Sequence, residues 1–134
     1  MKKILFIEDD NFIRENFCEI FAEEGYEMRC VSGGKDGIEL ATKFLPDLII
    51  CDIMMPVMDG FEVKNILSKN KKTSDIPFIY LTAKANIMDA QHAMELGADD
   101  FITKPVTATK LLELISKRLK RIDELKRNKV EKKG

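Results

Sequence analysis

The sequence predicts an α/β protein in which one parallel sheet is covered by helices on both faces. Three apolar runs show no polar alternation and each leads into polar residues; they are residues 4–7, 48–51 and 77–81. An unbroken run of this length is typical of a strand buried on both faces, as in the middle of a parallel sheet. Amphipathic helical patterns separate these runs, and helical crossovers between buried strands imply parallel pairing.

Strand and helix patterns alternate from the start of the chain. The first strand is followed by a helical pattern that stops at Gly25, a weaker strand at 26–31 and a helical pattern that stops before Pro46. The alternation continues with a helix at 59–69, a strand at 77–81, a helix that stops at Gly97, a strand at 98–102 and a helix from Thr107 onward. Asp59 and Glu62 have the spacing of a capping box, which marks a helix start.

Five strand–helix units in about 120 residues fit a flavodoxin-like, doubly wound five-stranded parallel sheet with strand order 2-1-3-4-5 and five helices, the last one extended. Strands 1 and 3 then flank the point where the winding direction reverses. Ligands of such sheets bind there, at the carboxyl ends of the strands. Asp9 and Asp52, which follow strands 1 and 3, are therefore expected to face one crevice.

The composition predicts one globular domain. A chain of 134 residues can bury a core without disulfides or metals, and 45% hydrophobic with 34% charged residues is unlike a disordered chain. No run approaches the roughly 20 apolar residues of a membrane helix, and the first residues lack the pattern of a signal peptide. We therefore expect a cytoplasmic protein without a membrane segment.

The three cysteines share no metal-ligand spacing, and each lies in an apolar segment; they are Cys18, Cys30 and Cys51. This pattern predicts reduced thiols in the core of a cytosolic protein.

Charge divides the chain unevenly. Residues 106–134 hold ten Lys and Arg against four Asp and Glu, whereas residues 1–105 hold 12 against 19. We expect a domain at 1–120 and a basic helical extension or linker at 121–134. Its apolar spacing fits either an ordinary final helix or a helix that leads to an output domain or a dimer. The extension has no interleaved aromatic residues, which argues against direct nucleic-acid binding.

Five polar residues stand at the predicted carboxyl ends of strands 1, 3, 4 and 5; they are Glu8, Asp9, Asp52, Thr82 and Lys104. Three crowded carboxylates repel one another and must share a cation or bind protons. Oxygen ligands without nearby Cys or His suit Mg²⁺. A cation, a hydroxyl and an ammonium group around a carboxylate nucleophile can support phosphoryl transfer through an aspartyl phosphate. A purely structural ion-pair network around Lys104 is the alternative.

Four segments in order carry a resemblance to a known family; they are residues 4–10, 52–60, 81–83 and 97–105. From Lys2 to about Leu119 the chain resembles the receiver domain of two-component response regulators, of the type found in chemotaxis regulators. The resemblance implies that Asp52 is the phosphoacceptor and that Lys104 contacts the phosphoryl group. It also implies a cis peptide bond between Lys104 and Pro105.

The resemblance further implies a Mg²⁺ site and a switch. Asp9 would bind the metal directly, Glu8 through water, and the Met54 carbonyl and Asp52 would complete the ligands; Asp10 would be the second acid if the register slipped by one residue. Thr82 would be the switch hydroxyl and Phe101 the aromatic ring that reports activation. Phosphorylation would then reshape the surface formed by the helix after Thr82, the last strand and the last helix.

This interpretation describes a phosphorylation-activated switch rather than a free-standing enzyme. Its expected partners are a sensor histidine kinase or a histidine phosphotransfer protein, a C-terminal output domain, and a second copy bound through the last helix or the reshaped surface. One alternative is a haloacid-dehalogenase-like phosphatase, but that chemistry needs an Asp two residues after the nucleophile, where this chain has Met54. The other alternative is an interaction module that does not respond to phosphorylation.

Overall fold

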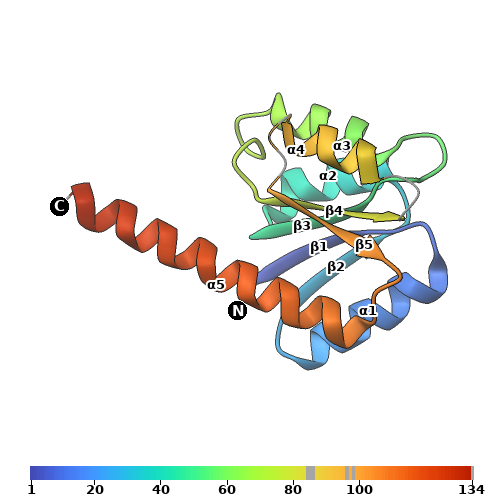
Figure 1. The fold of residues 1–134 in the computed structure, drawn as a ribbon, viewed down its shortest axis with the longest axis horizontal. Helices are drawn as coiled ribbons and strands as arrows, with labels where there is room; N and C mark the ends of the chain where they lie inside the picture. Colours follow the sequence, from blue (N-terminus) through green and yellow to red (C-terminus); the bar gives the residue numbers. More distant parts are fainter. Residues whose placement is uncertain (84–86, 96, 98, 134) are drawn as a thin grey trace.

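The computed structural model describes residues 1–83, 87–95, 97 and 99–133. Strands and helices alternate along it (Figure 1). The strands are β1 (Lys3–Ile7), β2 (Glu27–Val31), β3 (Leu48–Asp52), β4 (Phe78–Ala83) and β5 (Asp100–Lys104). The helices are α1 (Asn11–Glu23), α2 (Gly34–Phe44), α3 (Gly60–Ser68), α4 (Ile87–Glu95) and α5 (Ala108–Lys133).

All neighbouring strands pair in parallel, and their order is β2-β1-β3-β4-β5. The predicted doubly wound sheet with order 2-1-3-4-5 is therefore confirmed. In the central pair Ile7 lies opposite Cys51, so β3 continues one residue past the end of β1 and Asp52 is level with Glu8. The residues that follow them must meet at one edge of the sheet.

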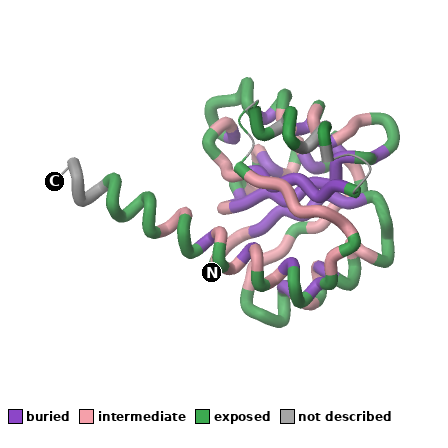
Figure 2. Tube along the Cα trace, in the orientation of Figure 1, coloured by how far each residue is buried: buried purple, intermediate pink, exposed green. Residues whose placement is uncertain are grey.

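The sheet separates two apolar cores. One core lies beneath α2 and α3 and takes Leu5 and Ile7 from β1, whereas the other lies beneath α1 and α5 and takes Ile4 and Phe6. Figure 1 shows α4 on the same side as α2 and α3. All of β3 is buried (Figure 2). A strand covered on both faces has no solvated side, which explains why its sequence lacks polar alternation.

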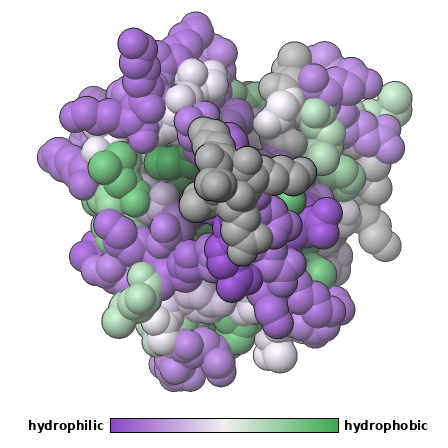
Figure 3. All heavy atoms as spheres, turned by 90° about the vertical axis from the view of Figure 1, so that its left-hand side faces the viewer, coloured by the Kyte–Doolittle hydropathy of each residue, from purple (hydrophilic) through white to green (hydrophobic). Residues whose placement is uncertain are grey.

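Helix α5 continues far past the body of the domain (Figure 1). Thr107 caps its start by accepting a hydrogen bond from the Lys110 amide at 3.1 Å. Farther along, Asp123 Oδ1 lies 2.7 Å from Lys2 Nζ, and residues 124–129 are exposed. Hydrophilic side chains cover most of the face seen from the side where α5 projects (Figure 3). None of the described helices is both long and apolar enough to cross a membrane.

Two of the three cysteines depart from the prediction. Cys18 on α1 and Cys30 on β2 form a disulfide, with their Cα atoms 6.5 Å apart, and both residues are partly exposed. The prediction of reduced core thiols is wrong for this pair because α1 packs back along β2, and the turn between them hides the proximity from any spacing rule. Cys51 is free and buried, as predicted.

Helix α3 begins directly against the end of β3. Its cap Asp59 accepts a hydrogen bond from the Glu62 amide at 2.9 Å. A Cβ atom on Gly60 would lie only 2.6 Å from the Asp52 carbonyl oxygen and 3.0 Å from Ile53 Cα. Because both atoms belong to the backbone, only glycine permits this approach, and the approach fixes the backbone at Asp52.

Replacement of Gly60 by serine should therefore destabilise the fold. We expect Gly60→Ser to lower the free energy of unfolding by about 1–3 kcal/mol, since the new Cβ must displace backbone. Gly33→Ser is the matched control, because a Cβ at Gly33 has no atom within 4 Å. Urea denaturation of both variants measures the difference. Equal stability of the two would contradict the proposed close contact.

Candidate functional site

The carboxyl ends of β1 and β3 bring three carboxylates together. Glu8 and Asp9 directly follow β1, and Asp52 is the last residue of β3. One ligand oxygen from each lies within 4.8 Å of the others. Glu8 is fully buried and Asp52 is 6% exposed, whereas Asp9 is exposed. The cluster therefore opens to solvent on the side of Asp9.

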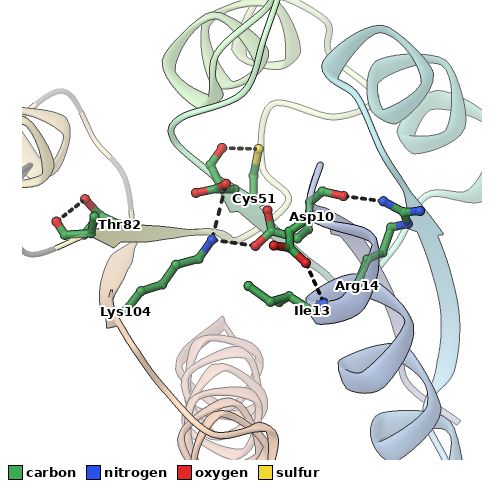
Figure 4. A network of polar contacts seen from close by, with 9 residues as sticks. Asp10, Ile13, Arg14, Cys51, Thr82 and Lys104 are labelled. Carbon is green, nitrogen blue, oxygen red and sulfur yellow. Dashed lines mark hydrogen bonds and ion pairs between the residues drawn. The ribbon is translucent and has the colours of Figure 1, made fainter.

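Lys104 completes the cluster from the last residue of β5. Its Nζ lies 2.5 Å from Glu8 Oε1 and 3.3 Å from Asp52 Oδ2 (Figure 4). The peptide bond between Lys104 and Pro105 is cis, as predicted. One ammonium group is thus shared by two carboxylates that would otherwise repel each other.

Backbone hydrogen bonds hold Glu8 from two sides. Its amide donates to the Val31 carbonyl of β2 at 3.0 Å. Its own carbonyl accepts from Arg14 Nη1 of α1 at 2.9 Å (Figure 4). Asp10 instead caps α1, accepting a hydrogen bond from the Ile13 amide at 2.9 Å. The Asp10 side chain is thereby engaged at the start of α1, whereas Glu8 and Asp9 are the acids that come close to Asp52.

Burial dominates the electrostatics of Glu8. Its loss of solvation, followed by the proximity of the Asp52 carboxylate, raises the pKa of Glu8 to about 8, although Lys104 acts in the opposite direction. Burial alone would lower the pKa of Lys104, but its hydrogen bond to Glu8 and the charges of both carboxylates raise it. Lys104 is therefore charged at neutral pH while Glu8 holds a proton in part of the molecules.

The cluster fits a hard divalent cation. Among the residues that the structure describes, Glu8 Oε2 is the one buried side-chain oxygen without a hydrogen-bond partner. Carboxylate oxygens are the ligands that Mg²⁺ prefers, and a cation would favour the ionised form of Glu8 over the protonated one. The residues present therefore suit Mg²⁺.

Thr82 and Phe101 lie beside the cluster without joining it. The buried Thr82 hydroxyl donates to the Ala83 carbonyl of its own strand at 3.1 Å (Figure 4). Phe101 is partly buried and lies opposite Tyr80, two residues before Thr82. Because side chains alternate along a strand, Thr82 and Phe101 occupy the same face of the sheet. Met54, in the loop after β3, has an exposed side chain.

Sequence reasoning missed several residues that support the cluster. Arg14 donates a hydrogen bond to the Glu8 carbonyl. Arg14 lies one helical turn after the cap residue Asp10, and this spacing could have indicated that its side chain reaches back toward the end of β1. The Cys51 thiol donates to the Asp52 carbonyl at 3.3 Å. Gly60 packs on the same carbonyl. No local sequence pattern marks the last two contacts, which depend on how α3 meets β3.

An apolar groove of about 590 Å³ lies between α1 and the start of α5, beside Lys104. It is lined by Phe12, Ile13, Asn16, Phe17, Ala83, Lys104, Pro105, Val106, Thr107 and Ala108. Phe12 stands out because it is 79% exposed.

Comparison with known proteins decides the family. Residues 4–116 match the family model of the response regulator receiver domain. The chain belongs to this receiver-domain family. Receiver domains are signalling switches that are generally not classed as enzymes, and they generally bind Mg²⁺ at an acidic pocket.

Solved structures of other receiver domains share this fold. A response regulator receiver domain from Clostridium thermocellum has 29% sequence identity and a TM-score of 0.83, over 93% of this chain and 99% of that one. The chemotaxis protein CheY4 of Vibrio cholerae has 28% identity and a TM-score of 0.81, over 87% and 98%. Both consist of little more than the matched receiver domain.

Longer proteins also contain a similar segment. The DNA-binding dual master transcriptional regulator RpaA of Synechocystis sp. is 36% identical over 125 residues, which are 93% of this chain and 52% of that protein. This receiver domain thus spans about half the length of the curated relatives that it matches.

The raised pKa of Glu8 predicts an unusual pH dependence for the metal-free receiver domain. Glu8 titrates near 4.5 when unfolded and near 8 when folded, so the folded state binds more protons between these values. The contribution of Glu8 to the free energy of unfolding should be fully present below about pH 4.5. It should decrease as the pH rises toward 8, by up to about 1.4 kcal/mol per pH unit. Urea denaturation in EDTA from pH 5 to 8 measures the decrease.

Glu8→Gln is the control for this dependence, because glutamine keeps the shape but does not titrate. The variant should lose the decrease between pH 5 and 8. In the parent protein, saturating Mg²⁺ should weaken the decrease, since metal binding favours the ionised carboxylate. An unchanged slope in the Glu8→Gln variant would assign the effect to another group.

Proposed function

We propose that this receiver domain is a switch that accepts a phosphoryl group on Asp52 from a sensor histidine kinase or a histidine phosphotransfer protein. One observation carries the proposal: a nearly buried carboxylate stands between two acids and an ammonium group at the open edge of the sheet. This arrangement offers one nucleophilic oxygen and groups that can offset the charge of an incoming phosphoryl group.

In the proposed transfer an Asp52 oxygen bonds to phosphorus while the bond from phosphorus to the donor imidazole nitrogen breaks. Lys104 is already 3.3 Å from Asp52 and can pair with a phosphoryl oxygen without a large movement. Glu8, Asp9, Asp52 and the Met54 carbonyl would hold Mg²⁺, which neutralises negative charge on the phosphoryl oxygens. The buried position of Glu8 keeps water from one side of the site.

The competing functions fit the site less well. A haloacid-dehalogenase-like phosphatase needs an acid two residues after its nucleophile, and Met54 has no titratable group there. In a purely structural ion-pair network, each buried polar atom would have a hydrogen-bond or ion-pair partner. Here Glu8 Oε2 is buried without a partner, and the pKa of Glu8 is raised. Both features agree better with a site that binds a cation.

The groove beside Lys104 favours a protein as phosphoryl donor. It is apolar, it adjoins the acidic cluster, and the ring of Phe12 projects from it into solvent. Exposed apolar surface next to a reactive group is typical of a contact surface. We therefore place the donor protein over α1 and the start of α5.

Phosphorylation would act through Thr82 and Phe101. The Thr82 hydroxyl now bonds to its own strand, and a phosphoryl oxygen on Asp52 offers it a charged acceptor instead. An inward shift of Thr82 leaves space on the face that it shares with Phe101, whose ring can turn into that space. A shift from mostly inactive to mostly active needs about 5.5 kcal/mol, which two or three charge-assisted hydrogen bonds at about 1.5–3 kcal/mol each can supply.

The output of the switch would lie on α4, β5 and α5. We infer a receiver domain at 1–120 and a basic helical extension at 121–134 that leads to an output domain or joins a second copy. Matched relatives about twice as long as this chain support an output domain. Direct nucleic-acid binding by the extension remains disfavoured because residues 121–134 hold no aromatic side chain. We place the switch in the cytoplasm, where its proposed partners act.

The assignment of Asp52 predicts the result of a labelling experiment. Incubation with acetyl phosphate and Mg²⁺ should add one phosphoryl group, seen as one mass increment in intact-protein mass spectrometry. Asp52→Asn should abolish the increment, since the amide is not a nucleophile. Asp9→Asn should weaken Mg²⁺ binding at least tenfold by calorimetry, because it removes one charged ligand. Labelling of the Asp52→Asn variant at the parental level would refute the assignment.

The role of Thr82 predicts a loss of coupling without a loss of binding. A beryllofluoride mimic should change the self-association of the parent protein, measured by analytical ultracentrifugation. Thr82→Ala should bind the mimic but respond at least fivefold less, because the hydroxyl that senses the phosphoryl group is gone. Thr103→Ala, one strand over and level with Thr82, is the matched control. An identical response of Thr82→Ala and parent would show that the switch does not pass through this hydroxyl.

A further inference from the structure

The Cys18–Cys30 pair connects two elements that hold the acidic cluster. Cys18 lies on α1 and Cys30 on β2, with a Cα separation of 6.5 Å, within the 4.4–6.8 Å range of disulfides. Both residues are partly exposed, so small reagents can reach them. The buried Cys51 takes no part in the pair.

Each cysteine adjoins a residue that fixes the backbone of Glu8. Cys18 is one helical turn after Arg14, whose guanidinium donates to the Glu8 carbonyl at 2.9 Å. Cys30 directly precedes Val31, whose carbonyl accepts from the Glu8 amide at 3.0 Å. A bond between the cysteines therefore joins the two supports of Glu8 to each other.

We propose that Cys18 and Cys30 are a reversible redox pair whose oxidation tightens the Mg²⁺ site. This proposal rests on the proposed function, because it assumes that Glu8 belongs to that site. Disulfides seldom persist in the cytoplasm, where we place the chain, and those that form there are mostly transient or redox-sensing. A partly exposed cysteine pair between two separate elements suits a redox-sensing role better than the role of a permanent structural disulfide.

The proposed oxidant is a low-molecular-weight disulfide. The thiolate of one cysteine attacks a sulfur of the reagent, which releases one reagent thiolate and forms a mixed disulfide. The second cysteine, after losing its proton, attacks the protein sulfur of that mixed disulfide and releases the second reagent thiolate. Two protein thiols are thereby oxidised by two electrons, and one reagent disulfide is reduced to two thiols.

The bond preorganises the site by limiting relative motion of α1 and β2. Removing a residue that supports a metal ligand typically weakens metal binding about 10–100-fold. The cysteines adjoin the residues that support Glu8 rather than Glu8 itself, so their effect on the affinity should be smaller. We therefore expect the oxidised protein to bind Mg²⁺ roughly threefold or more tightly than the reduced protein. The disulfide closes a loop with a sequence separation of 12. The melting temperature of the oxidised protein should therefore exceed that of the reduced protein by on the order of 10 °C.

The first experiment counts thiols. The full chain is equilibrated in buffers with different ratios of reduced to oxidised glutathione, denatured, alkylated with N-ethylmaleimide and weighed by mass spectrometry. Oxidised protein should carry one alkyl group, on Cys51, and reduced protein three, with a reversible transition between them. Cys18→Ser is the control and should give only a glutathione adduct. Three alkylated thiols in the parent at every ratio would overturn the proposal.

The second experiment compares the two forms of the unmutated protein. Calorimetry with MgCl₂ should show tighter binding after oxidation, and a Cys18→Ser/Cys30→Ser variant should show no difference between the buffers. Equal Mg²⁺ affinities of the two forms would overturn the coupling to the metal site. If neither form bound Mg²⁺, the proposed function would fail together with the coupling, while the thiol count and melting temperatures would still show whether the pair forms.

Discussion

Repulsion among Glu8, Asp9 and Asp52 is the constraint on which the rest of the structure depends. Their ligand oxygens lie within 4.8 Å of one another, and two of the three residues are buried. Separated from solvent, such charges cost free energy unless a cation or a proton offsets them. Lys104 provides part of that offset, and the raised pKa of Glu8 shows that burial also favours its protonated form. The cluster is thus stable enough to persist but still favours an additional cation.

The fold can hold this unfavourable cluster because the strands beneath it are rigid. Both faces of β3 are covered by apolar side chains, so Asp52 cannot move away from Glu8 without disturbing a packed core. Gly60 packs closely against the Asp52 carbonyl. The same packing that stabilises the sheet therefore keeps the carboxylates close together.

The sequence was sufficient to predict which strand ends meet, but not how each side chain points. Apolar runs with helices between them imply a parallel sheet, and in such a sheet the carboxyl ends of β1, β3 and β5 must share an edge; the positions of Asp52 and Lys104 followed from that rule. The hydrogen bond of Thr82 to its own strand depends on a rotamer, which no periodicity encodes. The Cys18–Cys30 contact depends on how α1 is rotated over β2, and that rotation is decided by packing.

A local change at Asp52 can reach α5 only through physical contacts, and the structure offers a short series of them. Thr82 lies opposite Thr103, one residue before Lys104, so a shift at the end of β4 bears directly on β5. Asp100, at the other end of β5, is paired with Arg118 of α5. Helix α5 is in turn held to the first residues of the chain by Lys2 and Asp123. Leu111, Ile115 and Leu119 of α5 are buried in the apolar core on that face of the sheet, so the helix is packed against the strands as well as paired with β5. In the proposed switch, these contacts would be the route by which a displacement near Thr82 reaches α5.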